Sequence, residues 1–149
     1  MRLSLLSHRS ALVAVTLLTA MGGAACSADE EAEPDVASLR LTVGNQTINV
    51  SDNGTVTGGP ITLTAGGNAT VTAAFLNAAG TQDPIAHGAD FQLNATPAST
   101  ATVTFARTGA FTGTLNGVAA GTTTLEVSLF HTVEMHADFG PFDVPVTVN

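Results

Sequence analysis

A short segment near the C-terminal end of the chain gathers the side chains best suited to chemistry. Two histidines and two carboxylates fall within eight residues, as His131, Glu134, His136 and Asp138. Imidazole and carboxylate together are a competent ligand set for zinc or copper. The segment is therefore a candidate metal site, and zinc or copper is the cofactor that it would take.

The strands predicted around this segment decide whether its side chains can meet. If the chain is extended here, Glu134, His136 and Asp138 occupy alternate positions and share one face of a strand. His131 ends the preceding strand with the same parity as Leu129, so a turn must bring it round to the others. The site thus depends on a hairpin between two strands.

His87 is a further candidate ligand, in a loop that also holds Asp83 and Asp90. It joins the site only if that loop lies at the same end of the fold. Against the metal interpretation, the segment 131–138 lacks a Cys pair or an H-E-x-x-H motif, and acidic loops with histidines are commonly solvated connectors. A lone methionine such as Met135 more often packs against a neighbouring apolar side chain than binds copper. The alternative is a connector that needs no cofactor.

Motifs for catalysis are missing from the sequence. It contains no G-x-S-x-G elbow, no glycine-rich phosphate loop that opens a helix, and no lysine. Ser128 is expected in the middle of a strand, where no elbow exposes its hydroxyl. We predict that the protein is not an enzyme.

From residue 38 onward the chain alternates apolar and polar residues with a period of two, which indicates strands. Glycine, asparagine and aspartate clusters separate these runs and are typical of turns. No segment shows a helical stripe with caps. The sequence predicts an all-β domain over 38–149, folded as an immunoglobulin-like β-sandwich of about seven to nine strands.

Two stretches carry a resemblance to a known family. Residues 101–105 (ATVTF) and 113–127 (GTLNGVAAGTTTLEV) resemble the last strands of bacterial immunoglobulin-like (Big-type) domains. The resemblance extends over roughly residues 61–129, although the tryptophan often found in that family is absent. It implies a sandwich that serves as a spacer, an adhesive module or an accessory part of a surface protein, with no common active site.

The N-terminus has the pattern of an export signal. Arg2 and Arg9 precede an apolar run at residues 11–18, and small residues follow it. An apolar run of this length is typical of a secretory signal peptide and is too short for a stable membrane span. We predict a signal peptide over residues 1–25.

Cys26 is the only cysteine of the chain. Residues 21–26 (MGGAAC) resemble a bacterial lipoprotein signal, which implies that Cys26 is the lipidated N-terminus of the mature protein. Residues 26–37 then form a linker, and its acidic residues without large apolar side chains predict disorder. The membrane, reached through this lipid, is the first expected partner.

The net charge expected for the mature chain limits which other classes of partner it can bind. Two arginines stand against twelve acidic residues after removal of the signal, a net charge of −10, and tryptophan and tyrosine are absent. Phosphate backbones and anionic lipid surfaces are bound mainly by lysine and arginine. We therefore expect no nucleic acid partner and no direct contact with headgroups. An envelope protein that pairs with an exposed edge strand remains a possible partner.

These features together predict an exported, lipid-anchored cell-envelope protein with a non-catalytic immunoglobulin-like binding or spacer domain. Ser27 after the cysteine resembles the sorting signal of outer-membrane lipoproteins. The alternative location is secreted or periplasmic. The alternative function is a periplasmic or surface metal-binding protein that uses the 131–138 segment.

Overall fold

The structure, a computed structural model, describes residues 32–149. The predicted signal peptide and Cys26 lie outside these residues, and so do residues 27–31 of the predicted linker. The described part of the chain folds entirely into strands, turns and loops, and it contains no helix that could cross a membrane.

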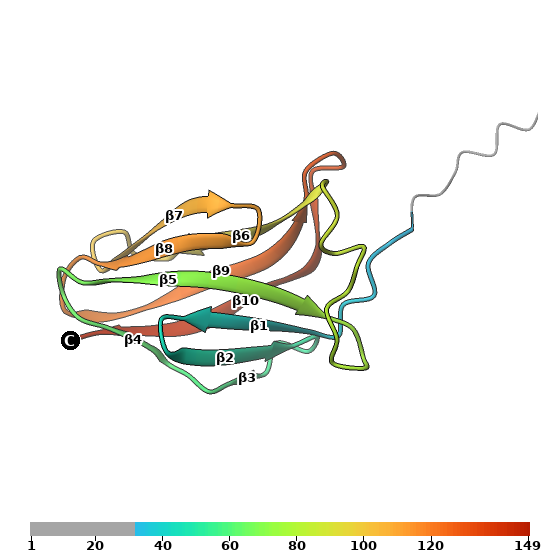
Figure 1. The fold of residues 1–149 in the computed structure, drawn as a ribbon. Helices are drawn as coiled ribbons and strands as arrows, with labels where there is room; N and C mark the ends of the chain where they lie inside the picture. Colours follow the sequence, from blue (N-terminus) through green and yellow to red (C-terminus); the bar gives the residue numbers. More distant parts are fainter. Residues whose placement is uncertain (1–31) are drawn as a thin grey trace, which may run out of the picture. The chain divides into compact units, whose positions relative to one another are not determined.

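Ten strands form two mostly antiparallel sheets that pack into a sandwich (Figure 1). One sheet has the order β3-β2-β1-β5-β8-β7 and the other the order β4-β10-β9-β6. The strands are β1 (Ser38–Val43), β2 (Gln46–Ser51), β3 (Val56–Thr57), β4 (Ile61–Leu63), β5 (Asn68–Leu76), β6 (Phe91–Pro97), β7 (Val103–Gly109), β8 (Thr112–Gly117), β9 (Gly121–His131) and β10 (His136–Val148). The predicted all-β sandwich is confirmed, with ten strands in place of about seven to nine.

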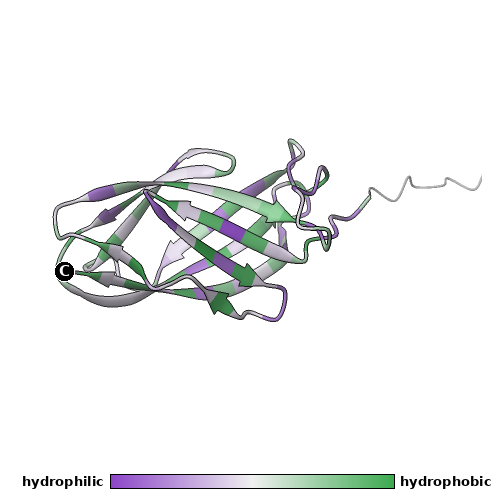
Figure 2. Cartoon of the chain, turned by 60° about the horizontal axis from the view of Figure 1, so that its bottom comes forward, coloured by the Kyte–Doolittle hydropathy of each residue, from purple (hydrophilic) through white to green (hydrophobic). Residues whose placement is uncertain are grey.

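The period-two pattern explains most of these strands. In β1, Leu39, Leu41 and Val43 are fully buried, whereas Arg40 and Thr42 between them are exposed. Figure 2 shows the same alternation of hydrophobic and hydrophilic residues along several strands. One face of each sheet therefore supplies the core between the two layers.

Strand β8 does not show the alternation of large apolar and polar residues, because glycines occupy two of its three inward positions. Gly113, Leu115 and Gly117 are its buried positions. A Cβ added to Gly113 would collide with the ring of Phe105, and one added to Gly117 would lie 2.6 Å from the backbone oxygen of Thr64. Close approach of neighbouring groups thus requires glycine where the pattern leads one to expect a large apolar residue.

Phe75 of β5 is one of the largest fully buried side chains of the core. The rings of Phe111 and Phe139 lie near it, with centroids 6.1 and 5.9 Å away in edge-to-face arrangements. Phe139 belongs to β10 of the opposite sheet, so this aromatic cluster joins the two layers.

The last residues of the predicted linker are attached to the sandwich. The amide of Ala37 donates to the carbonyl of Leu76 at 2.8 Å, and the amide of Asp52 donates to the carbonyl of Ala37 at 3.1 Å. Val36 packs against the core. Figure 1 shows that β1 and β10 begin at the same end of the sandwich and that the C-terminus lies at the opposite end.

Candidate metal centre

The turn between β9 and β10 carries the predicted site. His131 and His136 are paired across the two strands, and residues 132–135 form the turn between them. The amide of Met135, a residue with φ 62°, donates to the carbonyl of His131 at 2.9 Å. The amide and the hydroxyl of Thr132 both donate to the carbonyl of Asp90, at 2.7 and 2.8 Å. The two histidines are therefore cross-strand neighbours on a turn that is tied to the start of β6.

The imidazole of His131 is buried without a hydrogen-bond partner. The residue is 3% exposed, and its ring stacks on Phe91 with centroids 4.5 Å apart. Neither Nδ1 nor Nε2 finds a hydrogen-bond partner among residues 32–149. An unsatisfied buried polar group costs about 1–3 kcal/mol, and native proteins contain few of them. Both nitrogens of this buried imidazole are therefore free to contact a water molecule or an ion.

Glu134 stands between the two histidines. Its Oε2 lies 3.6 Å from Nδ1 of His131 and 3.5 Å from Nδ1 of His136. Charge-assisted hydrogen bonds are shorter, at about 2.7–2.9 Å. The observed separations instead approach the ~3.4 Å between two ligands of a tetrahedral zinc ion with bonds of about 2.1 Å. The three ligand atoms all lie within 4.8 Å of one another, so small side-chain shifts would let an ion fit between them.

Asp138 orients His136 from the other side of the ring. Nε2 of His136 lies 2.6 Å from Oδ1 of Asp138, and this hydrogen bond is the largest cause that raises the pKa of His136 above 6.5. The carboxylates of Glu134 and Glu33 also raise this pKa by their charge. When Nε2 donates to Asp138, Nδ1 presents its lone pair toward Glu134 and His131. Carboxylates commonly orient metal-binding histidines in this way.

A β-bulge places Asp138 beside His136. Ala137 pairs with Phe130 and Phe139 pairs with Leu129, so Asp138 has no partner in β9. An extra residue of this kind bends the strand and redirects its side chains. The Asp138 side chain is 7% exposed, and its Oδ2 is buried without a hydrogen-bond partner within the described part of the chain.

Residues 132–135 are a turn and not extended, so the condition under which Glu134, His136 and Asp138 would share one face of a strand is not met. Glu134 lies in the turn, and Asp138 lies in a bulge. The structure still brings both carboxylates to His136, because the tight turn folds Glu134 back over the two histidines. Asp138 orients a ligand rather than joining the group of three.

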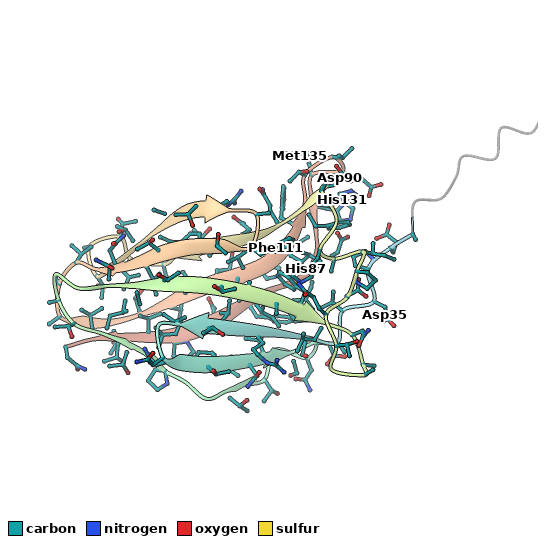
Figure 3. The ribbon with its side chains drawn as sticks, in the orientation of Figure 1. Asp35, His87, Asp90, Phe111, His131 and Met135 are labelled. Carbon is teal, nitrogen blue, oxygen red and sulfur yellow. The ribbon has the colours of Figure 1, made fainter. Side chains whose placement is uncertain are left out.

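Met135 does not pack against an apolar neighbour as expected. It is 71% exposed at the tip of the turn, next to Val133, which is 66% exposed. Figure 3 shows Met135 at the outer end of the turn, with His131 and Asp90 close by. Its side chain is thus accessible to solvent.

Glu33 was not predicted as a member of this group. It belongs to the predicted linker, where it is one of several acidic residues with no distinctive spacing. The structure places its carboxylate within 4.8 Å of the ligand atoms of His136 and Asp138. No sequence signal links Glu33 to the turn, because the two are roughly 100 residues apart in the sequence.

His87 lies apart from the group at His131. Its Nε2 accepts a hydrogen bond from the amide of Phe75 at 3.1 Å, so the proton of the neutral ring is on Nδ1. Nδ1 lies 2.7 Å from Nε2 of Gln82; because a protonated Nδ1 needs an acceptor, the nitrogen and oxygen of this side-chain amide are to be exchanged so that the oxygen faces the ring. The ring also packs against Phe111 at 4.3 Å. Both nitrogens are already used, and the arrangement is structural.

The two aspartates near His87 also have structural roles. Oδ1 of Asp83 accepts hydrogen bonds from the amides of Ile85 and Ala86, at 2.9 and 2.8 Å. Asp90 contributes its backbone carbonyl to the turn at Thr132. The loop before β6 thus supports the site's turn without supplying a ligand.

The partly buried, hydrogen-bonded imidazole of His87 predicts that the stability of the fold depends on pH. Burial lowers the pKa of His87 below 6.5, and the nearby Asp83 carboxylate opposes this shift only in part. A group whose folded pKa is lowered stabilises the fold fully above its unfolded pKa, and this contribution is lost as pH falls through the folded value. Thermal unfolding between pH 7.5 and 5 should therefore show a larger loss of Tm in the wild type than in His87→Gln.

The His87→Gln comparison separates this effect from His136. The raised pKa of His136 favours the fold at low pH, and it is present in both proteins, so it cancels in their difference. Equal pH profiles for the two proteins would contradict the prediction.

Comparison with known proteins places the chain in no established family. No protein-family model matches the sequence, and no curated protein matches it. Among solved structures, it is similar to the crystal structure of domains 4 and 5 of the S-layer protein SbsC, with 20% sequence identity and a TM-score of 0.47. The match covers 79% of this chain and 54% of that one, so the chain spans about half the length of that structure. The resemblance to bacterial immunoglobulin-like domains stays a prediction, and we argue the function from the site.

Proposed function

We propose that the protein is an exported, lipid-anchored cell-envelope protein whose β-sandwich acts by binding rather than by catalysis. The export pattern of residues 1–25 and the single Cys26 support the anchor. The all-β fold agrees with the resemblance to bacterial immunoglobulin-like domains. That resemblance implies a surface protein without an active site. The outer membrane is the location that Ser27 favours, with a secreted or periplasmic domain as the alternative.

The anchor is tested by labelling cells with a fatty-acid analogue. The wild-type protein should take up the label and sediment with membranes, whereas Cys26→Ser should remain unlabelled and soluble. A Cys26→Ser protein that still sediments with membranes would count against lipidation.

The ligand that the geometry supports best is a divalent transition metal, zinc or copper, bound by His131, Glu134 and His136. The observation that carries this proposal is the buried His131 imidazole, which has no hydrogen-bond partner among the described residues and lies 3.6 Å from Glu134. Two nitrogens and one oxygen suit zinc and copper. Three protein ligands leave one tetrahedral position to water or to a further ligand.

Charge around the turn also favours a cation. Three carboxylates, from Glu33, Glu134 and Asp138, lie beside two imidazoles. The described residues include two arginines, Arg40 and Arg107, and neither forms a salt bridge with these carboxylates. Like charges held this close oppose one another, and a bound cation would relieve the repulsion.

Calorimetric titration of the mature chain carrying Cys26→Ser tests the metal proposal. We expect saturable binding of one zinc ion per chain. His136→Ala should weaken it by at least about 100-fold, because losing even an outer-shell partner of a metal ligand costs about 10–100-fold. His87→Gln is the matched control and should bind as the wild type does. Absence of saturable zinc or copper binding in the wild type would exclude the metal function.

A further inference from the structure

We propose that Glu33 makes the membrane tether part of the metal site, so that metal loading holds the tether against this end of the sandwich. This inference rests on the metal function proposed above. It concerns a second group of side chains, Glu33, His136 and Asp138, whose ligand atoms lie within 4.8 Å of one another.

The fold brings the tether to the histidines. Glu33 precedes β1, and His136 opens β10, and both strands begin at the same end of the sandwich (Figure 1). Ala37 is fixed by its hydrogen bonds to Leu76 and Asp52, so Glu33 starts from an anchored point only a few residues away. Figure 3 shows Asp35 at this same end of the molecule.

His136 connects the two groups through its two ring nitrogens. Nδ1 lies 3.5 Å from Glu134 on the side of His131, and Nε2 lies 2.6 Å from Asp138. A metal on Nδ1 withdraws electron density from the ring, which makes the Nε2 proton a stronger donor and adds a large local positive charge. Both effects attract the carboxylates of Asp138 and Glu33.

Two buried side chains at this end of the sandwich have polar atoms that lack hydrogen-bond partners among residues 32–149. The His131 imidazole, 4% exposed in its side chain, has two nitrogens without hydrogen-bond partners among residues 32–149. Asp138 keeps an unpartnered Oδ2 in a side chain that is 7% exposed. The carboxylate of Glu33 already lies beside His136 and Asp138, and the charge of a bound cation would strengthen its attachment there. The tether therefore responds to the ion.

Docking of Glu33 would change how the domain stands on the membrane. Ala37 and Val36 are attached to the sandwich, so a linker without a docked Glu33 would extend over residues 26–35 and reach roughly 35 Å at about 3.3–3.6 Å per residue. With Glu33 held, residues 26–32 remain, and their reach falls to roughly 25 Å. Metal loading would thus bring the histidine end of the sandwich closer to the lipid surface.

The test uses the mature chain with Cys26→Ser and zinc alone as the probe. Glu33→Gln should weaken zinc binding by about 10-fold, the lower end of the effect of an outer-shell partner. Asp35→Asn, an exposed carboxylate of the same linker, is the matched control and should bind zinc as the wild type does. Linkage requires that zinc also strengthens docking, so heteronuclear NOEs of the amides of Ala32, Glu33 and Asp35 should rise on zinc addition and stay low in Glu33→Gln.

The outcomes separate this inference from the metal function. Wild-type zinc binding with an unchanged affinity in Glu33→Gln, or with tether NOEs that do not respond to zinc, overturns the role of the tether and leaves the metal site standing. Wild-type protein that binds no zinc overturns both. Equal weakening in Glu33→Gln and Asp35→Asn also overturns it, because general charge would then explain the effect.

Discussion

Replacing His131 with phenylalanine is expected to stabilise the metal-free protein and to abolish its zinc binding. The imidazole is buried, stacks on Phe91 and has two nitrogens without hydrogen-bond partners among the described residues. Phenylalanine keeps a flat ring against Phe91 and removes the unsatisfied polar atoms. Urea denaturation without metal should show a free energy of unfolding higher by about 1–3 kcal/mol, reduced by whatever strain the larger ring causes.

The same substitution at His87 is the matched control. His87 accepts a hydrogen bond from the amide of Phe75, so His87→Phe leaves that amide without its acceptor and should lower the free energy of unfolding. Zinc binding should persist in His87→Phe. If His131→Phe were destabilised as much as His87→Phe, the His131 nitrogens would have structural partners and the argument for a ligand would fail. Stability gained with function lost is typical of binding sites that hold unsatisfied groups.

The second large effect is expected from Phe75→Ala. Phe75 is fully buried in β5, and its ring meets Phe111 and, from the opposite sheet, Phe139. Truncating a buried phenylalanine costs about 3–5 kcal/mol through lost burial and the cavity left behind. That is a large part of the roughly 5–15 kcal/mol that stabilises a typical domain. Urea denaturation followed by far-ultraviolet circular dichroism measures it.

Val118→Ala serves as the reference for Phe75→Ala. Val118 is 49% exposed, so its truncation should change the free energy of unfolding by no more than about 0.5 kcal/mol. A loss below about 1 kcal/mol for Phe75→Ala would mean that the aromatic cluster does not join the two sheets as described.

Local patterns predicted the strands where one face is apolar. Leu39, Leu41 and Val43 reveal β1 without knowledge of its neighbours, because a strand shows alternate side chains to opposite faces. The pattern failed at β8, where Gly113 and Gly117 face inward. Gly113 must be glycine because Phe105 of the neighbouring strand β7 approaches it, and Gly117 because the backbone of Thr64, which is distant in the sequence, approaches it.

The sequence predicted the four residues of the turn as candidates, but it missed Glu33, included His87, and did not predict the geometry. Proximity along the chain placed His131, Glu134, His136 and Asp138 in one segment, and the structure brings them together at one turn. The sequence did not predict which of these side chains face one another and which one hydrogen-bonds to His136 from behind. This arrangement depends on the bulge at Asp138, which appears only when β10 pairs with β9. The metal itself stays a prediction.

By itself, the sequence determined the all-β class and the faces of most strands, and it supplied the predicted export signal and anchor, because these depend on neighbouring residues along the chain. Only the tertiary structure decided that His87 hydrogen-bonds to the backbone of Phe75 and that Glu33 lies beside His136. It also decided that His131 is buried without a hydrogen-bond partner in the described chain. The physical reason is that burial and partnership of a polar side chain depend on which distant strands pack around it, and period-two alternation carries no information about that packing.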